Sequence, residues 1–195
     1  MEKKNWSQDL PDLALLQKEL KRERYKRRFR KLLRSTVNAL IVVAAIAALI
    51  ATLVLPVLQI AGTSMEPSLN DGDIVLLMKT DRLETGDLCA FYYSNKILIK
   101  RIIAIPGDYL WINPDGTVYL NGTELQEPYV SEKALGECDI EFPYQVPENH
   151  YFMMGDHRET SIDSRSSVIG CIAEDQIIGK ILCRVWPLAQ FLWIA

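Results

Sequence analysis

Hydrophobic and polar positions divide the chain into three parts. No charged residue occurs from Ser35 to Met65, and the stretch from Ala39 to Leu58 is predominantly apolar. About 20 such residues are enough to cross the hydrocarbon core of a bilayer, so this stretch predicts a membrane-spanning helix. The alternatives are a buried core helix and the apolar part of a cleaved signal peptide, but the stretch is too long for either.

Different patterns lie on the two sides of this apolar stretch. Upstream, Leu and Ala recur at mixed helical spacings in "LPDLALLQKELKRER", which indicates a short amphipathic helix from Asp12 onward. Downstream, short runs of β-branched, aromatic and aliphatic residues alternate with Gly, Pro, Asp and Asn, and this is typical of strands. The runs are "DIVLLMK", "DLCAFYY", "KILIKRIIAI", "TVYLNGTEL", "HYFMMG" and "KILCRVW".

Asn121-Gly122 interrupts one of these runs and predicts a hairpin turn, because both residues tolerate positive φ. The same Asn-Gly-Thr also matches a glycosylation acceptor, but the turn explains it without assuming a eukaryotic host. Turn signals recur too often for a βαβ fold. We therefore expect a mainly β fold, an antiparallel domain of bent sheets with one N-terminal transmembrane helix. Its parts are a basic leader (1–36), the anchor (37–60) and a β-rich domain (61–195).

Charge is distributed unevenly between these parts. Residues 1–34 contain 12 Lys or Arg against 5 Asp or Glu, whereas the remainder contains 10 against 20. Basic residues flanking a span remain on the cytoplasmic side, so the anchor is expected to cross the plasma membrane once, with an extracytoplasmic acidic domain. The basic segment serves either to set this topology or to bind anionic lipid headgroups. No nucleic-acid partner is expected.

Four cysteines and two histidines limit the possible metal and redox chemistry. Cys89, Cys138, Cys171 and Cys183 lie on the exterior side, where disulfides persist, but buried free thiols are an equal alternative and the sequence does not select a pairing. There is no CxxC pair, and the only histidines are His150 and His157. We expect no metal site and no cofactor.

A candidate nucleophile, Ser64, follows the apolar stretch in "GTSMEPSL". A Ser hydroxyl needs a base, which is either His157 in a Ser-His-Asp triad or a lysine. Lys100 lies in the apolar run "KILIKRIIAIPGD", where desolvation would lower its pKa and let the neutral amine accept a proton. The structural alternative is that Lys100 points outward while its neighbours pack.

Three motifs in this order resemble the type I signal peptidases, the bacterial Ser-Lys membrane proteases. They are "SMEPSL" after the anchor, "KRIIAIPGD" about forty residues later, and "MGDHRETSIDSR" near the C-terminus. The similarity extends to "EPYV", "VPENHYFMMGD" and "RVWPL". The resemblance implies that Ser64 is the nucleophile and Lys100 the general base. It also implies that Ser161 orients the Lys amine, while Asp163 and Arg165 brace that segment.

The same resemblance implies that Asp156 and Arg158 are structural. The spacing agrees with this, because Asp and Arg two positions apart lie on one face of an extended segment and can pair. A solvated charge cluster is the alternative for the four charged residues Asp156, Arg158, Asp163 and Arg165. The sequence departs from the family pattern at two positions. Gly62 replaces a Ser whose hydroxyl helps to bind the oxyanion in some relatives, and His157 replaces the Asn of "GDNR". We expect the Ser64 N–H to stabilise the oxyanion, Gly62 to allow close approach, and His157 to replace a backbone hydrogen bond of the Asn.

The implied activity is removal of signal peptides from exported preproteins, which pair with an exposed strand edge. Signal peptides carry small residues before the cut, and shallow apolar pockets lined by Ile60, Met65 and Ile99 would select them. Two alternatives remain, a self-cleaving repressor with a related fold and a membrane-anchored binding protein without turnover. The membrane span argues against the first and the joint presence of Ser64, Lys100 and Ser161 against the second. The oligomeric state is left unassigned.

Overall fold

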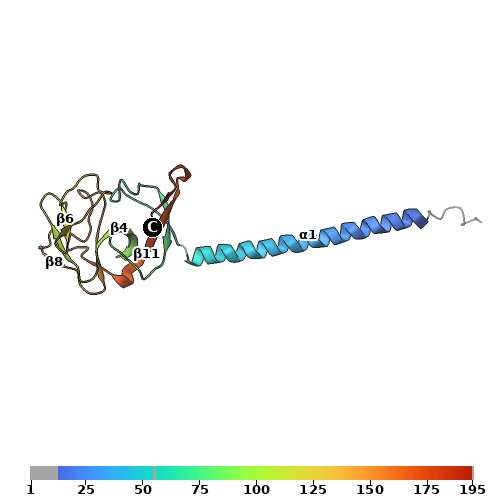
Figure 1. Ribbon diagram of the computed structural model, residues 1–195, viewed down its shortest axis with the longest axis horizontal. Helices are drawn as coiled ribbons and strands as arrows, with labels where there is room; N and C mark the ends of the chain where they lie inside the picture. Colours follow the sequence, from blue (N-terminus) through green and yellow to red (C-terminus); the bar gives the residue numbers. More distant parts are fainter. Residues whose placement is uncertain (1–12, 55, 195) are drawn as a thin grey trace, which may run out of the picture. The chain divides into compact units, whose positions relative to one another are not determined.

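The computed structural model describes residues 13–54 and 56–194, which form two compact units (Figure 1). One unit contains most of helix α1 (Leu13–Val54), and the other, from Thr52 onward, contains the strands. Residues 1–12 of the predicted leader, including Asp12, lie outside the described residues. The expected mainly β, antiparallel fold with one N-terminal apolar helix is confirmed.

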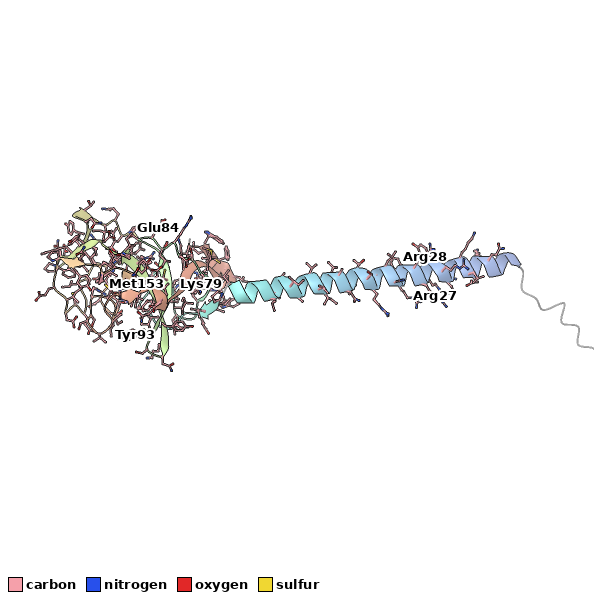
Figure 2. The ribbon with its side chains drawn as sticks, turned by 90° about the horizontal axis from the view of Figure 1, so that it is seen from below. Arg27, Arg28, Lys79, Glu84, Tyr93 and Met153 are labelled. Atoms are coloured by element: carbon pink, nitrogen blue, oxygen red, sulfur yellow. The ribbon has the colours of Figure 1, made fainter. Side chains whose placement is uncertain are left out.

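Helix α1 is continuous through the basic segment and the apolar stretch. Within the described residues, Gln17–Leu49 is long and apolar enough to cross a membrane. The side chains of Arg27 and Arg28 project from its basic part (Figure 2). A separate short amphipathic helix is therefore not observed, because leucines, lysines and arginines continue one helix into the apolar stretch.

The helix ends earlier than the predicted anchor. The anchor was expected to reach residue 60, but α1 ends at Val54 and strand β1 (Val57–Gln59) already belongs to a sheet. Pro56 explains this boundary, since proline disfavours helical geometry before it and has no N–H to donate. Its carbonyl instead accepts a hydrogen bond from the Leu77 N–H at 2.9 Å.

The larger sheet is antiparallel and carries most of the predicted strands. Its order is β1-β2-β11-β3-β4-β9-β10, and β12 also pairs with β11. Five of the predicted runs form β2 (Ile74–Met78), β3 (Leu88–Tyr93), β4 (Lys96–Ala104), β9 (His150–Met154) and β11 (Ile177–Trp186). The short strands β10 (Ile172–Ala173) and β12 (Leu192–Trp193) were not predicted, and 3-10 turns η1 (Glu174–Gln176) and η2 (Leu188–Gln190) flank β11.

The smaller sheet has the order β7-β6-β5-β8. Strands β6 (Val118–Leu120) and β7 (Thr123–Glu124) form the predicted hairpin, in which Asn121 and Gly122 have φ values of 51° and 82°. Strands β5 (Tyr109–Ile112) and β8 (Tyr144–Gln145) were not predicted.

Register shifts bend the larger sheet. Strand β11 changes register against β2 between Ile181 and Cys183 and again before Trp186, and β4 does so against β9 after Ile102. Such bulges kink a strand and increase its twist. Three buried clusters fill the spaces between the strands, and one of them packs Ile60, Met65 and Leu69 beneath the Ser64 turn.

All four cysteines are free thiols in this structure. Cys89 and Cys183 are buried in the larger sheet, and Cys138 and Cys171 are partly buried. Of the two alternatives from the sequence, disulfides and free thiols, the structure therefore has free thiols.

Candidate active site

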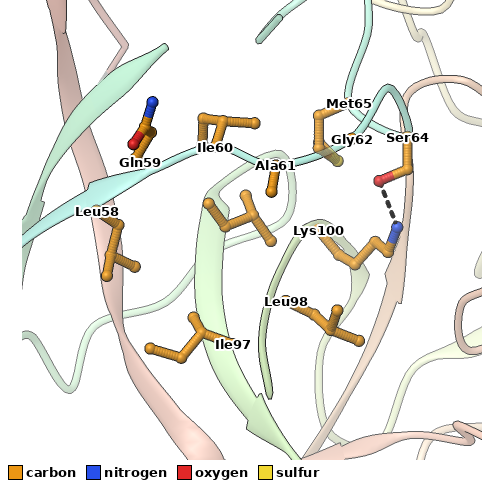
Figure 3. Close-up of a pocket in the computed structure, with 11 residues that line it drawn as sticks. Leu58, Gln59, Ile60, Ala61, Gly62, Ser64, Met65, Ile97, Leu98 and Lys100 are labelled. Atoms are coloured by element: carbon orange, nitrogen blue, oxygen red, sulfur yellow. Dashed lines mark hydrogen bonds between the residues drawn. The ribbon is translucent and has the colours of Figure 1, made fainter. Parts of the chain in front are cut away.

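Lys100 connects two serines that are distant in sequence. It lies on β4 and is only 4% exposed. Its Nζ hydrogen bonds to Ser64 Oγ at 2.8 Å and to Ser161 Oγ at 2.9 Å. Figure 3 shows the Lys100 side chain reaching Ser64 along one wall of a pocket. The alternative in which Lys100 points to solvent is therefore wrong.

The surroundings of Lys100 favour its neutral form. Burial lowers the pKa of its ammonium from 10.5 to about 8, and the positive charge of Arg165 acts in the same direction. The carboxylates of Asp163 and Asp156 oppose this shift and keep the pKa from falling further. A substantial fraction of the amine is therefore neutral near physiological pH and able to accept a proton.

A tight backbone approach positions Ser64. The His157 N–H donates to the Ser64 carbonyl at 3.1 Å, which joins the Ser64 turn to the segment after β9. Gly155 lies at this junction, and a Cβ there would meet both Ser161 Oγ and the Ser64 carbonyl oxygen. Glycine is required at position 155 because the two chains approach too closely for a side chain.

Asp163 and Arg165 form a buried ion pair, with 2.7 Å between Asp163 Oδ2 and Arg165 Nη2. The same Oδ2 accepts the Gly155 N–H at 2.9 Å, and Arg165 Nη2 also donates to the Ser161 carbonyl at 3.2 Å. These bonds hold the backbone on both sides of the Ser161 hydroxyl. The placement agrees with the bracing predicted from the resemblance.

Asp156 and Arg158 do not pair with each other. Asp156 accepts from Arg101 Nε at 2.9 Å and Nη2 at 2.6 Å, whereas Arg158 pairs with Glu127. Their side chains diverge because Gly155 to Arg158 forms a bend rather than an extended strand. The solvated-cluster alternative is also wrong, since all four charged residues are at most 1% exposed: Asp156, Arg158, Asp163 and Arg165.

Sequence reasoning missed four residues of this framework. Arg101 follows Lys100 on β4, and its guanidinium lies 3.8 Å from the centre of the Tyr129 ring in addition to binding Asp156. Glu127 and Tyr129 belong to "EPYV", a motif that was noted without a role, and Gly155 belongs to "MGD". The adjacency of "KR" and the charged residues within "EPYV" and "GDHR" were the available signals.

A cavity of about 290 Å³ opens beside Ser64 and Lys100. The residues predicted for a substrate pocket, Ile60, Met65 and Ile99, all line it. Leu58 and Ile97 lie at its other end, and Gln59 also contributes to the wall (Figure 3). Most of the side chains that line the pocket are aliphatic, and Ser64 and Lys100 lie at one end of it.

The two departures from the family pattern have specific surroundings. Gly62 has a φ of +96°, and a Cβ there would meet no atom within 4 Å, so backbone conformation rather than crowding within the chain accounts for the glycine. Its N–H donates to Asp71 Oδ1 at 2.8 Å. The His157 ring contacts the Thr160 hydroxyl through Nδ1 at 3.1 Å, which is a side-chain contact rather than a backbone hydrogen bond.

The fold thus places a serine hydroxyl beside a buried lysine amine at the edge of a pocket, and comparisons with known proteins give the family. Residues 33–186 match the family model described as signal peptidase, peptidase S26. The chain belongs to this family and is a peptidase of it.

Curated relatives support the same assignment. Signal peptidase IB of Staphylococcus aureus is 36% identical over 152 residues, which cover 68% of this chain and 78% of the relative. Signal peptidase I of Bacillus licheniformis is 36% identical over 144 residues, which cover 67% of this chain and 76% of the relative. A signal peptidase I structure from Enterococcus faecalis is 25% identical, with a TM-score of 0.44, and covers 52% of this chain and 98% of its own. Together with the apolar helix α1, the relatives indicate a membrane-anchored protein.

Proposed function

We propose that this chain is a membrane-anchored serine endopeptidase that removes signal peptides from exported preproteins with a Ser64-Lys100 dyad. One observation carries the proposal, namely the 2.8 Å contact between Ser64 Oγ and the amine of a buried lysine at the end of an apolar pocket. A neutral amine in this position can deprotonate the hydroxyl, which is the essential requirement for serine nucleophilic catalysis.

Each chemical step uses groups that meet at the dyad. Neutral Lys100 takes the Ser64 proton as Oγ attacks the scissile carbonyl carbon, and a tetrahedral oxyanion forms. The resulting ammonium donates its proton to the leaving amine when the C–N bond breaks, which leaves an ester on Ser64. A water then loses its proton to Lys100 and attacks the ester. Collapse of the second oxyanion releases the signal-peptide carboxylate, and the Lys100 ammonium returns its proton to Ser64 Oγ.

The Ser161 hydroxyl orients Lys100 in this mechanism. Its oxygen lies 2.9 Å from Nζ and its own segment is fixed by Asp163 and Arg165. Arg101, Asp156, Arg158 and Glu127 stabilise the surrounding loops rather than touching the substrate. The Ser64 N–H stabilises the oxyanion, because the Gly62 N–H is already donated to Asp71.

Two open strand edges support binding of an extended substrate. Strand β1 is the terminal strand of its sheet, so one of its edges is open. The second open edge belongs to the first part of β4, because β4 begins at Lys96 but pairs with β9 only from Arg101 onward. Residues 58–62 and 97–100 line the same pocket. An extended preprotein segment pairs with these edges and places its small side chains against Ile60, Met65 and Ile99.

The membrane arrangement follows from the charge pattern. The basic part of α1 stays in the cytoplasm, the apolar part crosses the bilayer, and the β-rich domain lies outside the plasma membrane. This topology presents the catalytic domain to preproteins as they emerge.

Cleavage of a preprotein with an Ala-x-Ala site, in detergent, tests the proposal. The intact chain should cut after the site, and folded Ser64→Ala and Lys100→Ala variants should be inert. Lys96→Ala is the matched control, since Lys96 is an exposed lysine on the same strand and should be dispensable. Full activity of Lys100→Ala would reject the dyad and restore His157 as a candidate base, whereas an inert parent would favour a binding protein.

A further inference from the structure

The turn Asn70–Asp73 holds the segment that leads from β1 to Ser64. The Ile60 N–H donates to the Asp73 carbonyl at 2.8 Å, and the Gly72 N–H donates to the Ile60 carbonyl at 3.0 Å. These two bonds extend the pairing of β1 with β2. The third bond differs in kind, because the Gly62 N–H donates to the Asp71 side chain at 2.8 Å. A carboxylate thus takes the place of a strand partner where the ladder ends.

This third bond determines which way the neighbouring peptide groups face. In an antiparallel ladder, the N–H and C=O groups of successive residues point alternately to one edge and the other. Ile60 and Gly62 face the turn, so Gln59 and Ala61 face the opposite edge. In the described part of the chain, β1 has no strand on that edge. Gln59 and Ala61 also line the pocket that contains Ser64.

Gly62 is the point at which this alternation would be lost most easily. Glycine populates many backbone conformations, and Gly62 adopts a φ of +96° between the pocket wall and the nucleophile. Asp71 is exposed and makes no ion pair with the described residues, and its side chain accepts the Gly62 N–H. Its effect on the fold as a whole is therefore small compared with its effect on this segment.

We propose that Asp71 is a positioning residue that holds Ala61 and Gly62 in the register that pairs with the substrate backbone beside Ser64. The inference rests on the proposed function and adds a residue outside its dyad. Asp71 acts through the Gly62 peptide and touches neither Ser64 nor Lys100. Its loss should therefore weaken substrate binding and leave proton transfer unchanged.

Steady-state cleavage of an Ala-x-Ala preprotein by the full chain in detergent tests this role. For Asp71→Ala, KM should rise about tenfold while kcat stays within about threefold, as expected for lost uniform binding. Asp71→Asn keeps the acceptor oxygen and should restore the parental KM. Asp115→Ala is the matched control, because Asp115 is an exposed carboxylate that accepts the Thr117 N–H at a turn outside the site. Its kinetics should be parental.

Hydrogen exchange of the segment 60–64 gives a readout that does not depend on turnover. Exchange should accelerate by about tenfold in Asp71→Ala and remain parental in Asp71→Asn. A parental KM in Asp71→Ala, equal defects in the Ala and Asn variants, or a fall in kcat alone would overturn the inference while the proposed function stands. An inert parent enzyme would remove both.

Discussion

Lys100 Nζ and Ser161 Oγ lie 2.9 Å apart although the two residues are separated by 61 positions. Ser161 is 1% exposed, and the Arg165 guanidinium holds its carbonyl. The hydroxyl therefore has little freedom and fixes the direction in which the amine points. A side chain held in this way preorganises a base without contributing a proton itself.

Removing this hydroxyl should reduce turnover more than binding. Ser161→Ala leaves the pocket intact but lets the Lys100 amine rotate, so we expect kcat to fall by about 10- to 100-fold with little change in KM. Ser166→Ala is the matched control, because Ser166 is equally buried and its Oγ has no hydrogen-bond partner among the described residues. Equal losses in both variants would show that the segment is merely sensitive to substitution.

The pH dependence of cleavage should report Lys100. Its pKa is lowered to about 8, mainly by burial, and only the neutral amine acts as a base. We expect kcat/KM to rise about tenfold per pH unit below about pH 8 and to level off above it. His157→Ala should preserve this limb. A limb that disappears in His157→Ala would assign the base to the imidazole instead.

Much of the fold could be predicted from local patterns. The runs around β2, β4 and β11 combine β-branched residues with turn residues at both ends, and those signals are local. Strand β5 escaped because Pro, Asp and Asn surround its four residues, and the helix boundary at Val54 was missed because the apolar pattern continues past Pro56. Hydropathy describes how readily a segment transfers to lipid. The end of α1 is instead set by Pro56 and by the pairing of the following residues in the sheet.

The framework of the site was less accessible. The spacing of Asp163 and Arg165 correctly indicated a local pair, but the same spacing at Asp156 and Arg158 did not. Arg101 reaches Asp156 across 55 positions, and no local pattern specifies such a partner. Only the resemblance placed Lys100 beside Ser64, since burial of one lysine in a strand cannot be derived from its neighbours.

Lys100 should also make stability depend on pH. Its pKa in the folded protein lies near 8, below the ordinary 10.5, so the unfolded chain binds more protons between these values. Stability therefore rises as pH increases through that window, and below it the buried ammonium costs about 3 kcal/mol.

Lys100→Met, which cannot titrate, removes this dependence. The quantity to compare is the unfolding free energy of the variant minus that of the parent. This difference should be about 3 kcal/mol more favourable to the variant at neutral pH than at about pH 10.5. Denaturant unfolding in detergent at the two pH values measures the difference. Exposed Lys96→Met should show no comparable change, and a pH-independent difference for Lys100→Met would contradict the shifted pKa.

The ion pair of Glu127 and Arg158 should be far more costly to break than an exposed pair. Both side chains are fully buried, whereas Glu124 and Lys133 form an exposed pair with side chains 45% and 43% accessible. Glu127→Ala leaves an unpaired guanidinium in the interior, and we expect a loss of about 3–5 kcal/mol of unfolding free energy. Glu124→Ala should cost at most about 1 kcal/mol, because water already screens that pair. Chemical unfolding of both variants provides the comparison, and similar small losses would mean that Arg158 finds water or a new partner once Glu127 is gone.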